Sequence, residues 1–430
     1  MYFLIKFIFY IIFLINSILC YNPPRRNFHN SVIINDRLLI LAGEKNQSSD
    51  TYKLFYLNLS KSFDNKNLSW TLIPDGNLPI YTWHSTAIVG LDNFTIFLIG
   101  GYIKNKNTLD YDFSNQVYTY NYSVSKWTIP SIRGDSIPPR QQIKGVIDNS
   151  GIIYIFGGVN TTNLTAFSRL LYNDMNTLDT PSMTWRTLSI SENLPLPNGD
   201  YSASLLPNGV IVYIGGEEDI SWTLVNMKKI KLFDTTKLEW SYMNATGDDI
   251  DLRWQFSSVL TPDGDIIIFG GCTQKFTSVS PNLAVLDTNK SPYKWTISSN
   301  SDSNSLPSIY GHSANLYFNY IIITFGFNID TSLYNSNVYL YNITSNKWIT
   351  SFNPPPVPTT TSNTSTFTGT SSTSTGTSTS STSTLTTSTK KSLKGLAIGL
   401  GISVVVILGV FIIIFTLCKK KEILEISGDR

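Results

Sequence analysis

The feature that most constrains the fold is a short apolar run that ends on two glycines and recurs along the chain. Residues 152–158 give the clearest copy, Ile-Ile-Tyr-Ile-Phe-Gly-Gly. Five apolar residues rich in β-branched and aromatic types are too few for a helix and predict a buried strand. The glycines let the backbone turn with a positive φ, where a side chain would clash. The pair recurs every 55 to 58 residues, at 100–101, 215–216 and 270–271, with degenerate copies at 42–43 and 326–327.

Two further marks keep the same period. A tryptophan follows each pair by 21 to 27 residues, at Trp70, Trp127, Trp185, Trp240, Trp295 and Trp348. A ring followed by a small polar residue precedes each pair except the third, at His29-Asn30, His84-Ser85, Tyr201-Ser202, Phe256-Ser257 and His312-Ser313. Between pair and tryptophan, runs such as 117–121 and 338–342 alternate like strands. Each unit therefore predicts four strands in about 50 residues, which is the length and content of a propeller blade.

The glycine pairs, the tyrosine strand and the trailing tryptophan resemble the repeat of kelch β-propellers, a family represented in galactose oxidase, attractin and muskelin. The resemblance covers residues from about 28 to 352. It implies an all-β, six-bladed propeller whose Trp and Tyr rings pack between neighbouring blades. The weaker copies at both ends leave a seventh blade open.

The segments outside the repeats predict a membrane-anchored protein. Residues 1–20 carry one lysine before an apolar run, as in a signal peptide, with an uncleaved signal anchor as the alternative. The propeller is expected over 21–353, followed by a proline and Ser/Thr-rich disordered stalk over 354–394. Residues 395–417 contain no charge and are long enough to cross a bilayer. The lysines that open the tail at 418–430 favour a cytoplasmic C-terminus, hence a type I plasma-membrane protein with an extracellular propeller.

Asn-X-Ser/Thr sequons support this secretory route, because they are acceptors of N-linked glycans there. Their asparagines are Asn46, Asn58, Asn67, Asn93, Asn121, Asn160, Asn163, Asn244, Asn289, Asn342 and Asn363. Cys272 is the one cysteine between the signal peptide and the membrane segment, so no disulfide within the propeller is expected. A net charge of +2 over 430 residues gives no case for a nucleic-acid partner.

The resemblance also raises a catalytic alternative, because galactose oxidase holds copper with histidines and tyrosines. The three histidines here, His29, His84 and His312, are expected at one phase of the repeat, where other copies carry Tyr201 and Phe256. A position that accepts His, Tyr and Phe is a packing position rather than a metal ligand. We therefore expect no enzyme, no cofactor and no metal site, with a membrane-tethered copper-radical oxidase as the alternative.

A ligand face follows from the strand order of a blade. The chain alternates ends, so the loop after each glycine pair and the loop to the next blade open on one face, the loop face. The opposite face, the turn face, carries tight turns such as 207–209 and 262–264. Three tryptophans outside the repeat map to the loop face with further anchor types, giving a candidate set of Trp83, Tyr102, Trp222, Arg253, Trp254 and Tyr310.

These residues allow two interpretations. Exposed aromatic side chains beside an arginine are the usual anchors of a binding surface. The alternative is that the rings plug the mouth of the channel. The binding interpretation predicts a non-enzymatic cell-surface adhesion module for an extracellular protein or glycan.

Overall fold

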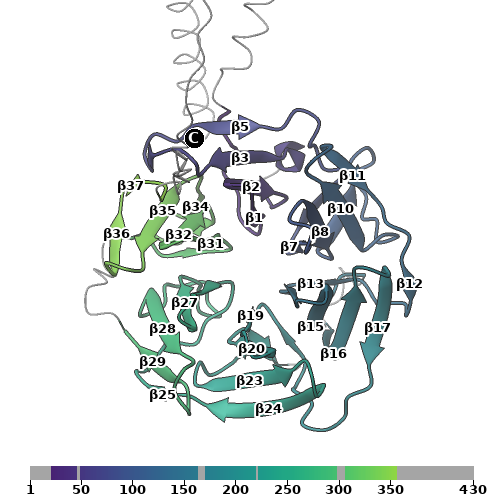
Figure 1. Cartoon of the computed structure of the whole chain (residues 1–430), viewed down its shortest axis with the longest axis vertical. Helices are drawn as coiled ribbons and strands as arrows, with labels where there is room; N and C mark the ends of the chain where they lie inside the picture. The colour runs from purple at the N-terminus through teal and green to yellow at the C-terminus, as the bar shows by residue number, and fades with distance from the viewer. Residues whose placement is uncertain (1–20, 46–48, 163–169, 219–220, 298–305, 356–430) are drawn as a thin grey trace, which may run out of the picture. The chain divides into compact units, whose positions relative to one another are not determined.

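A computed structural model describes residues 21–45, 49–162, 170–218, 221–297 and 306–355 of the chain. The chain divides into two units at Pro358, and residues 359–430 lie outside the described residues. Within the first unit, six antiparallel sheets stand around a central channel as the blades of a propeller (Figure 1). The prediction of an all-β, six-bladed propeller is confirmed.

Each blade has four main strands, ordered from the channel outward as they occur in the chain. Blade 1 consists of β1 (Asn30–Ile34), β2 (Arg37–Leu41), β3 (Phe55–Asn58) and β5 (Trp70–Leu72), and blade 2 of β7 (Thr86–Val89), β8 (Thr95–Ile99), β10 (Val117–Asn121) and β11 (Lys126–Thr128). Blade 3 consists of β14 (Val146–Ile147), β15 (Ile152–Asn160), β16 (Leu171–Asp179) and β17 (Thr184–Leu188), and blade 4 of β19 (Ser202–Leu205), β20 (Val210–Ile214), β23 (Lys229–Asp234) and β24 (Glu239–Asn244). Blade 5 consists of β26 (Ser257–Leu260), β27 (Asp265–Phe269), β28 (Leu283–Asp287) and β29 (Lys294–Thr296), and blade 6 of β31 (Ser313–Tyr317), β32 (Tyr320–Thr324), β35 (Val338–Asn342) and β36 (Lys347–Ile349).

Short elements complete these sheets. A single 3-10 turn, η1 (Ser49–Tyr52), precedes β3. The segments entering blades 3 and 5, β12 (Arg133–Gly134) and β25 (Thr246–Gly247), pair in parallel with the outer strands β17 and β29. They tie each of these blades to the connection that leads into it.

The hydrophobic core lies between blades, in six clusters that each join two neighbours. The cluster between blades 6 and 1, for example, packs Phe55 and Trp70 against Ile322 and Val338. Alternate side chains of a strand point to opposite faces of its sheet, so every blade supplies apolar side chains to both neighbours. The repeat tryptophans belong to these interfaces, as predicted: four are buried, and Trp127 and Trp348 are half-buried. No blade buries both of its faces without the rest of the ring.

The second glycine of each pair joins one blade to the next. Its backbone N–H donates to a carbonyl just before the inner strand of the following blade. Five of the six junctions show this bond, at 2.8 to 3.2 Å: Gly43 to Thr82, Gly101 to Arg140, Gly216 to Arg253, Gly271 to Ile309 and Gly326 to Arg26. A Cβ on Gly216 would lie 2.4 Å from the carbonyl oxygen of Gly199, closer than atoms can approach. The close approach of two backbones therefore requires glycine at this place.

A second ring of backbone hydrogen bonds surrounds the channel. It is formed by one residue per blade, all with φ between 50° and 61°: Phe28, His84, Gln142, Asp200, Gln255 and Gly311. At five junctions the N–H of one member donates to the carbonyl of the member in the preceding blade, at 2.7 to 3.3 Å. The two rings fix the position of each inner strand relative to its neighbour.

The alignment of the blades corrects two predictions from the sequence. The pair of blade 6 is Phe325–Gly326 rather than 326–327, because Gly326 makes the bond of a second glycine and Phe325 has the positive φ of a first one. His84 is also out of phase with the other two histidines. It occupies the place of Phe28, and Ser85 occupies the place that His29 and His312 take in their blades.

The ends of the propeller meet at blade 1. Strand β37 (Ser351–Phe352) pairs with β4 (Phe63–Asp64), and the Tyr21 N–H donates to the Trp70 carbonyl at 3.0 Å. The side chain of Phe352 is fully buried against Phe63, with ring centroids 4.7 Å apart. The chain that follows blade 6 thus closes the ring onto the outer part of blade 1.

The predicted signal peptide, membrane segment and cytoplasmic tail, and the predicted stalk beyond 355, lie outside the described residues. Across the parts of the chain that are described, no helix combines the length and apolarity needed to cross a membrane.

Candidate ligand face

Short accessory sheets build the loop face. In each, the segment before an inner strand pairs with the segment after the glycine pair of the same blade. The clearest are β6 (Ile80–Trp83) with β9 (Tyr102–Asn105), β18 (Asn198–Gly199) with β21 (Glu217–Glu218) and β22 (Thr223–Leu224), β30 (Ile309–Tyr310) with β33 (Phe327–Asn328) and β34 (Leu333–Tyr334), and β13 (Arg140–Gln141) with the end of β15. These pairings place both kinds of connection on one face, as predicted.

A continuous series of aromatic rings runs over this face across blades 2, 1, 6 and 5. Successive ring centroids lie 3.7 to 6.4 Å apart. We call this set the aromatic arc: Phe113, Tyr111, Tyr102, Trp83, His84, Phe28, Tyr310, Phe327, Tyr334, Phe276 and Trp254. Its most exposed members are Tyr111 (42%) and Phe276 (49%), which leave ring surface open to a ligand. The arc offers apolar and stacking surface over four consecutive blades.

Four predicted face residues belong to the arc. Trp83, Tyr102 and Tyr310 are half-buried in it, and the rings of Trp83 and Tyr102 stack at 5.3 Å. Trp254 is buried at one end, where its Nε1–H donates to the Thr273 carbonyl and its ring packs against Phe276. The prediction of exposure is therefore wrong for Trp254. Trp222 lies outside the arc and is half-exposed, and its carbonyl accepts a hydrogen bond from Gln274, a near neighbour of Phe276.

Arg253 is not a surface residue, so its assignment to a ligand face is wrong. Its side chain is fully buried and donates to the carbonyls of Gly270 at 3.0 Å and Pro281 at 2.8 Å. Burial lowers the pKa of Arg253 to about 10, which still leaves the guanidinium charged at neutral pH. Arg26 and Arg140 occupy the same place in their blades and donate to Ala42 and Gly157, the first residues of the local pairs. Each of these arginines therefore stabilises the turn at its glycine pair by donating a hydrogen bond to the carbonyl of the first residue of that pair.

Charged side chains flank the arc. The Lys104 ammonium lies 4.7 Å from the Tyr111 ring centroid and 5.6 Å from that of Trp83. Blades 3 and 4 also carry ion pairs, including Arg140 with Asp174 at 2.7 Å and Lys229 with Glu218 at 3.1 Å. Stacking at the arc and charge beside it are the features of a protein-recognition surface.

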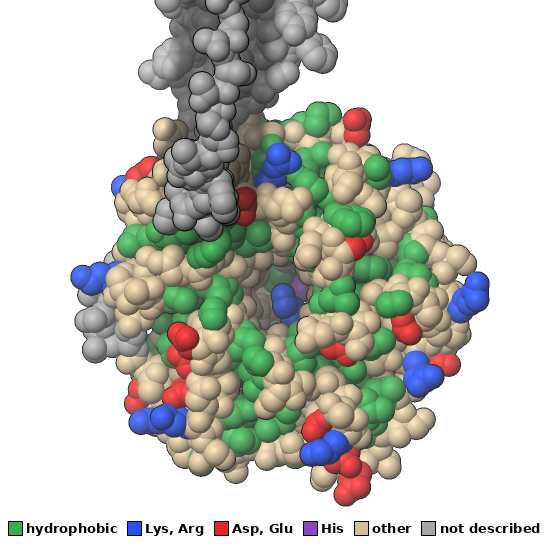
Figure 2. All heavy atoms as spheres, viewed as in Figure 1, with side chains coloured by type: hydrophobic (Ala, Val, Ile, Leu, Met, Phe, Trp, Pro, Cys, Tyr) green, Lys and Arg blue, Asp and Glu red, His purple; other side chains and the backbone are tan. Residues whose placement is uncertain are grey.

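The channel below the arc is hollow at its centre. The space-filling view looks into this hollow, where a basic side chain and a histidine are visible (Figure 2). A pocket of about 140 Å³ is lined by the start of the inner strand of every blade. His84 stacks on Phe28 with ring centroids 3.7 Å apart, and its Nδ1 lies 4.0 Å from the Asp200 carboxylate. Two members of the arc, Phe28 and His84, therefore line the polar pocket.

The other two histidines act as buried packing groups. His29 Nε2 lies 2.9 Å from Thr324 Oγ1, and His312 Nε2 lies 2.7 Å from Ser257 Oγ. Burial lowers the pKa of His29 well below its ordinary value and lowers the pKa of His312 to about 3, so both are neutral at pH 7. In the described part of the chain, no three His, Cys, Asp or Glu side chains are grouped to hold a metal ion. The copper-radical alternative finds no support.

Cys272 is fully buried after its glycine pair. Burial raises the pKa of its thiol, so the reactive thiolate is suppressed at neutral pH. Its Sγ lies 4.0 Å from Gln255 Oε1, and its backbone forms a β-bridge with Trp254.

Sequence reasoning missed more than half of the arc. Six of its eleven members were not singled out: Phe28, Tyr111, Phe113, Phe276, Phe327 and Tyr334. Their mutual contacts were not predictable, because they join different blades.

The fold and this face define the class of the protein, a β-propeller interaction module. The chain belongs to the kelch-repeat family: the family model described as the KLHDC2/KLHL20/DRC7 Kelch-repeats domain matches residues 18–216 and 209–385. The structure titled "Structure of YjhT" superimposes with a TM-score of 0.57 at 14% identity, over 77% of this chain and 99% of that one. At that identity the likeness shows the fold alone.

Several curated proteins are similar in sequence. Kelch domain-containing protein 3 of Rattus norvegicus is 26% identical over 264 residues, which cover 58% of this chain and 64% of the relative. Acyl-CoA-binding domain-containing protein 5 of Arabidopsis thaliana is 22% identical over 286 residues, 64% of this chain and 40% of the relative. Host cell factor of Drosophila melanogaster is 28% identical over 181 residues, 38% of this chain and 10% of the relative. The chain thus spans less than two thirds of the length of these relatives.

Proposed function

We propose that the protein is a non-enzymatic binding module that captures an extracellular protein on its loop face. The observation that carries the proposal is the aromatic arc, an apolar surface over four blades that no described segment covers. Aromatic anchors surrounded by polar groups supply most of the energy in protein recognition. Family membership supports the same class of function.

The proposal includes display at the cell surface. The sequence pattern of residues 1–20 and 395–417 supports it. The placement of the sequons in the described residues adds to this support. Six lie at the ends of strands on the turn face, at Asn58, Asn67, Asn93, Asn121, Asn289 and Asn342, and two, Asn160 and Asn244, lie on the loop face. Glycans at these six sites would leave the arc accessible to a partner.

The experiment compares two matched aromatic surfaces. The full-length protein is expressed on cells, and neighbouring surface proteins are identified by proximity labelling. The double variant Trp83→Ala, Tyr111→Ala should lose the labelled partner. Phe318→Ala, which removes a ring 60% exposed on the turn face, should keep it. Loss in Phe318→Ala, or retention in the arc variant, would contradict the assignment of the loop face.

A further inference from the structure

The channel pocket contains one lysine. Lys144 comes from the segment that leads into β14 in blade 3, the blade that lacks the ring-plus-serine signature. By register it takes the place that the other blades give to Asn30, Thr86, Ser202, Ser257 and Ser313. Five neutral polar side chains and one ammonium group therefore occupy equivalent positions around the channel. Blade 3 therefore differs from the other five blades by placing a charged side chain, Lys144, at this position.

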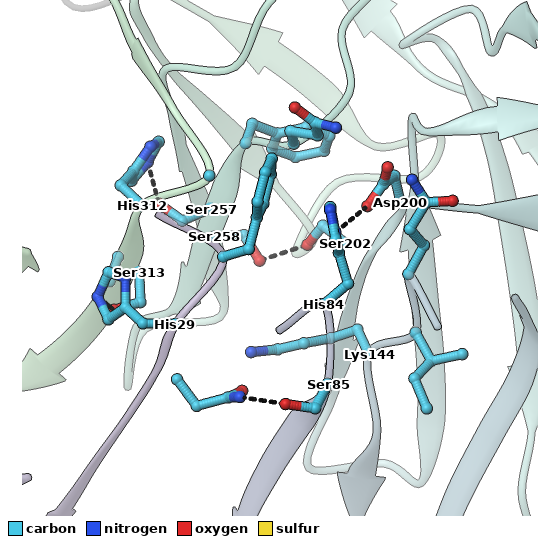
Figure 3. A pocket seen from close by; sticks show the side chains of 18 of the residues that line it. His29, His84, Ser85, Lys144, Asp200, Ser202, Ser257, Ser258, His312 and Ser313 are labelled. Atoms are coloured by element: carbon cyan, nitrogen blue, oxygen red, sulfur yellow. Dashed lines mark hydrogen bonds and ion pairs between the residues drawn. The ribbon is translucent and has the colours of Figure 1, made fainter. Parts of the chain in front are cut away.

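Lys144 has no partner for that charge. Among the described residues, its side chain makes no hydrogen bond or ion pair. Asp200 also lines the pocket, but its carboxylate lies beside His84 at 4.0 Å. The His29 and His312 rings are neutral, as described above. In Figure 3 the amine of Lys144 points into the pocket, away from the Asp200 carboxylate. The side chain of Lys144 is exposed to the solvent of the channel, so its charge is accessible to a ligand that enters the pocket.

Hydroxyl groups that can donate a proton lie around this amine. Ser85 Oγ accepts a hydrogen bond from Asn30 Nδ2 at 2.9 Å, which leaves its own proton free. Ser202 and Ser258 share one hydrogen bond between their hydroxyls, so one of the two protons is also free. Figure 3 shows Ser85 on one side of the Lys144 amine and the Ser202–Ser258 pair on the other. Two hydroxyls and an ammonium thus converge as donors, a set that suits a negatively charged acceptor.

We propose that the channel binds a small inorganic anion between the ammonium of Lys144, the hydroxyl of Ser85 and the Ser202–Ser258 pair. The pocket volume of about 140 Å³ is the room of about five water molecules, which accommodates chloride or phosphate with some of its water. The walls of the channel partly desolvate the Lys144 amine and lower its pKa, and a bound anion opposes that effect by stabilising the charged form. The site is independent of the proposed capture of a protein on the loop face. The anion would link the inner strands of blades 2, 3, 4 and 5.

The test measures anion binding to the purified full-length protein. Chloride and inorganic phosphate are titrated separately at constant ionic strength, balanced with a bulky sulfonate, and the thermal unfolding midpoint is followed. A ligand that binds the folded state alone raises this midpoint in a saturable way. We expect saturation with at least one of the two anions. In Lys144→Met the apparent affinity should fall about tenfold or more, as expected for the loss of a charge-assisted contact.

Two matched variants keep the result decisive. Lys237→Met, which removes a lysine that is 68% exposed, should keep the wild-type response. Ser85→Ala retains the ammonium and removes one hydroxyl, and it should weaken binding by several-fold even if Lys144→Met is too unstable to assay. A wild-type midpoint that does not saturate with either anion overturns the proposal. An equal response of wild type, Lys144→Met and Ser85→Ala overturns it as well, because the anion then acts elsewhere.

Discussion

The backbone N–H of Gly326 donates a hydrogen bond of 2.9 Å to the carbonyl of Arg26, and this contact joins blade 6 to the segment before blade 1. It repeats the bond that the second glycine makes at four other junctions. The second glycine is therefore required for the contact between neighbouring blades more than for the strand that it ends. Five of the described junctions use the same backbone geometry, so the ring is built from one kind of contact.

The two glycines of a pair should differ in their tolerance of a side chain. In blade 4, a Cβ at position 215 would lie 2.9 Å from a Phe256 ring atom, and blades 1 and 6 carry Ala42 and Phe325 at the equivalent place. A Cβ at position 216 would meet backbone atoms at 2.4 and 2.8 Å. We expect Gly215→Ala to cost about 1–2 kcal/mol of unfolding free energy, the ordinary penalty for a left-handed residue.

Gly216→Ala should cost more than about 3 kcal/mol, because the backbones of two blades must separate. Urea unfolding of both variants measures the difference. Equal costs would mean that the junction bond from Gly216 to Arg253 contributes nothing special.

Arg253 should contribute to the stability of the fold rather than to ligand binding. Arg253→Ala leaves the carbonyls of Gly270 and Pro281 without their donor and opens a cavity, so we expect a loss of about 3–5 kcal/mol in unfolding free energy. The control is Arg186→Ala in β17, whose side chain is exposed and should change stability by less than about 0.5 kcal/mol. An Arg253→Ala protein that melts normally but loses its partner would restore Arg253 to the ligand face.

The period of the glycine pairs was sufficient to predict the propeller, because two backbones in contact leave no room for a side chain at the second glycine. The phase within each repeat was less certain. His84 and Ser85 look like His312 and Ser313 in sequence, yet they are shifted by one residue against the inner strand. A one-residue shift exchanges the two sides of a strand, and nothing in a single sequence marks it.

The candidate face was predicted in place but not in detail. Arg253 was assigned to the surface because an arginine beside exposed aromatic rings is a usual binding anchor, and its burial here depends on two carbonyls that only the folded loops bring together. The aromatic arc depends in the same way on contacts between blades. Lys144 stood in the copy without a ring-plus-serine signature, and that irregularity was the available signal.

Alanine substitutions of individual tryptophans should distinguish those that stabilise the fold from those that bind the partner. Trp240 is 2% exposed, so Trp240→Ala should cost about 3–5 kcal/mol. Trp127 is half-buried with its Nε1–H donating to the Gly76 carbonyl, and its replacement should cost less. Trp222→Ala should leave stability nearly unchanged and weaken partner capture. Thermal melts together with the capture assay give both values, and a Trp222→Ala melt as low as that of Trp240→Ala would remove Trp222 from the binding surface.

The buried histidines should make the propeller sensitive to acid. The unfolded chain protonates His312 near its ordinary pKa of 6.5, whereas the folded state keeps it neutral down to a pKa of about 3. The unfolded state therefore binds more protons in this window, and stability falls as the pH falls from about 6.5 towards 3. Between pH 7.5 and pH 5 the loss from His312 is about 2 kcal/mol.

His312→Phe removes this contribution while keeping a ring that blade 5 carries at the same place, Phe256. The variant should lose less stability than wild type between pH 7.5 and pH 5, as measured by urea unfolding at each pH. Parallel curves for the two proteins would show that His312 is protonated in the folded state or that its burial is relieved by solvent.

Closure of the ring should depend on the last folded residues. Phe352 is fully buried, and its ring centroid lies 4.7 Å from that of Phe63 and 4.8 Å from that of Tyr320. Phe352→Ala removes the contact that holds β37 on β4, and we expect it to cost about 3–5 kcal/mol. Phe318→Ala, at an exposed ring of blade 6, is the control and should be close to neutral.

Deleting residues 306–353 removes blade 6 and exposes the apolar faces of blades 1 and 5. Because the core lies between blades, the remaining five have no way to bury those faces without a new ring geometry. We expect aggregation of the deletion variant, where the full chain shows one cooperative transition for the propeller. Size-exclusion chromatography and calorimetry distinguish the outcomes. A monomeric five-bladed protein with a sharp transition would show that closure through Gly326 and Phe352 is dispensable, and that each blade is more self-sufficient than its contacts indicate.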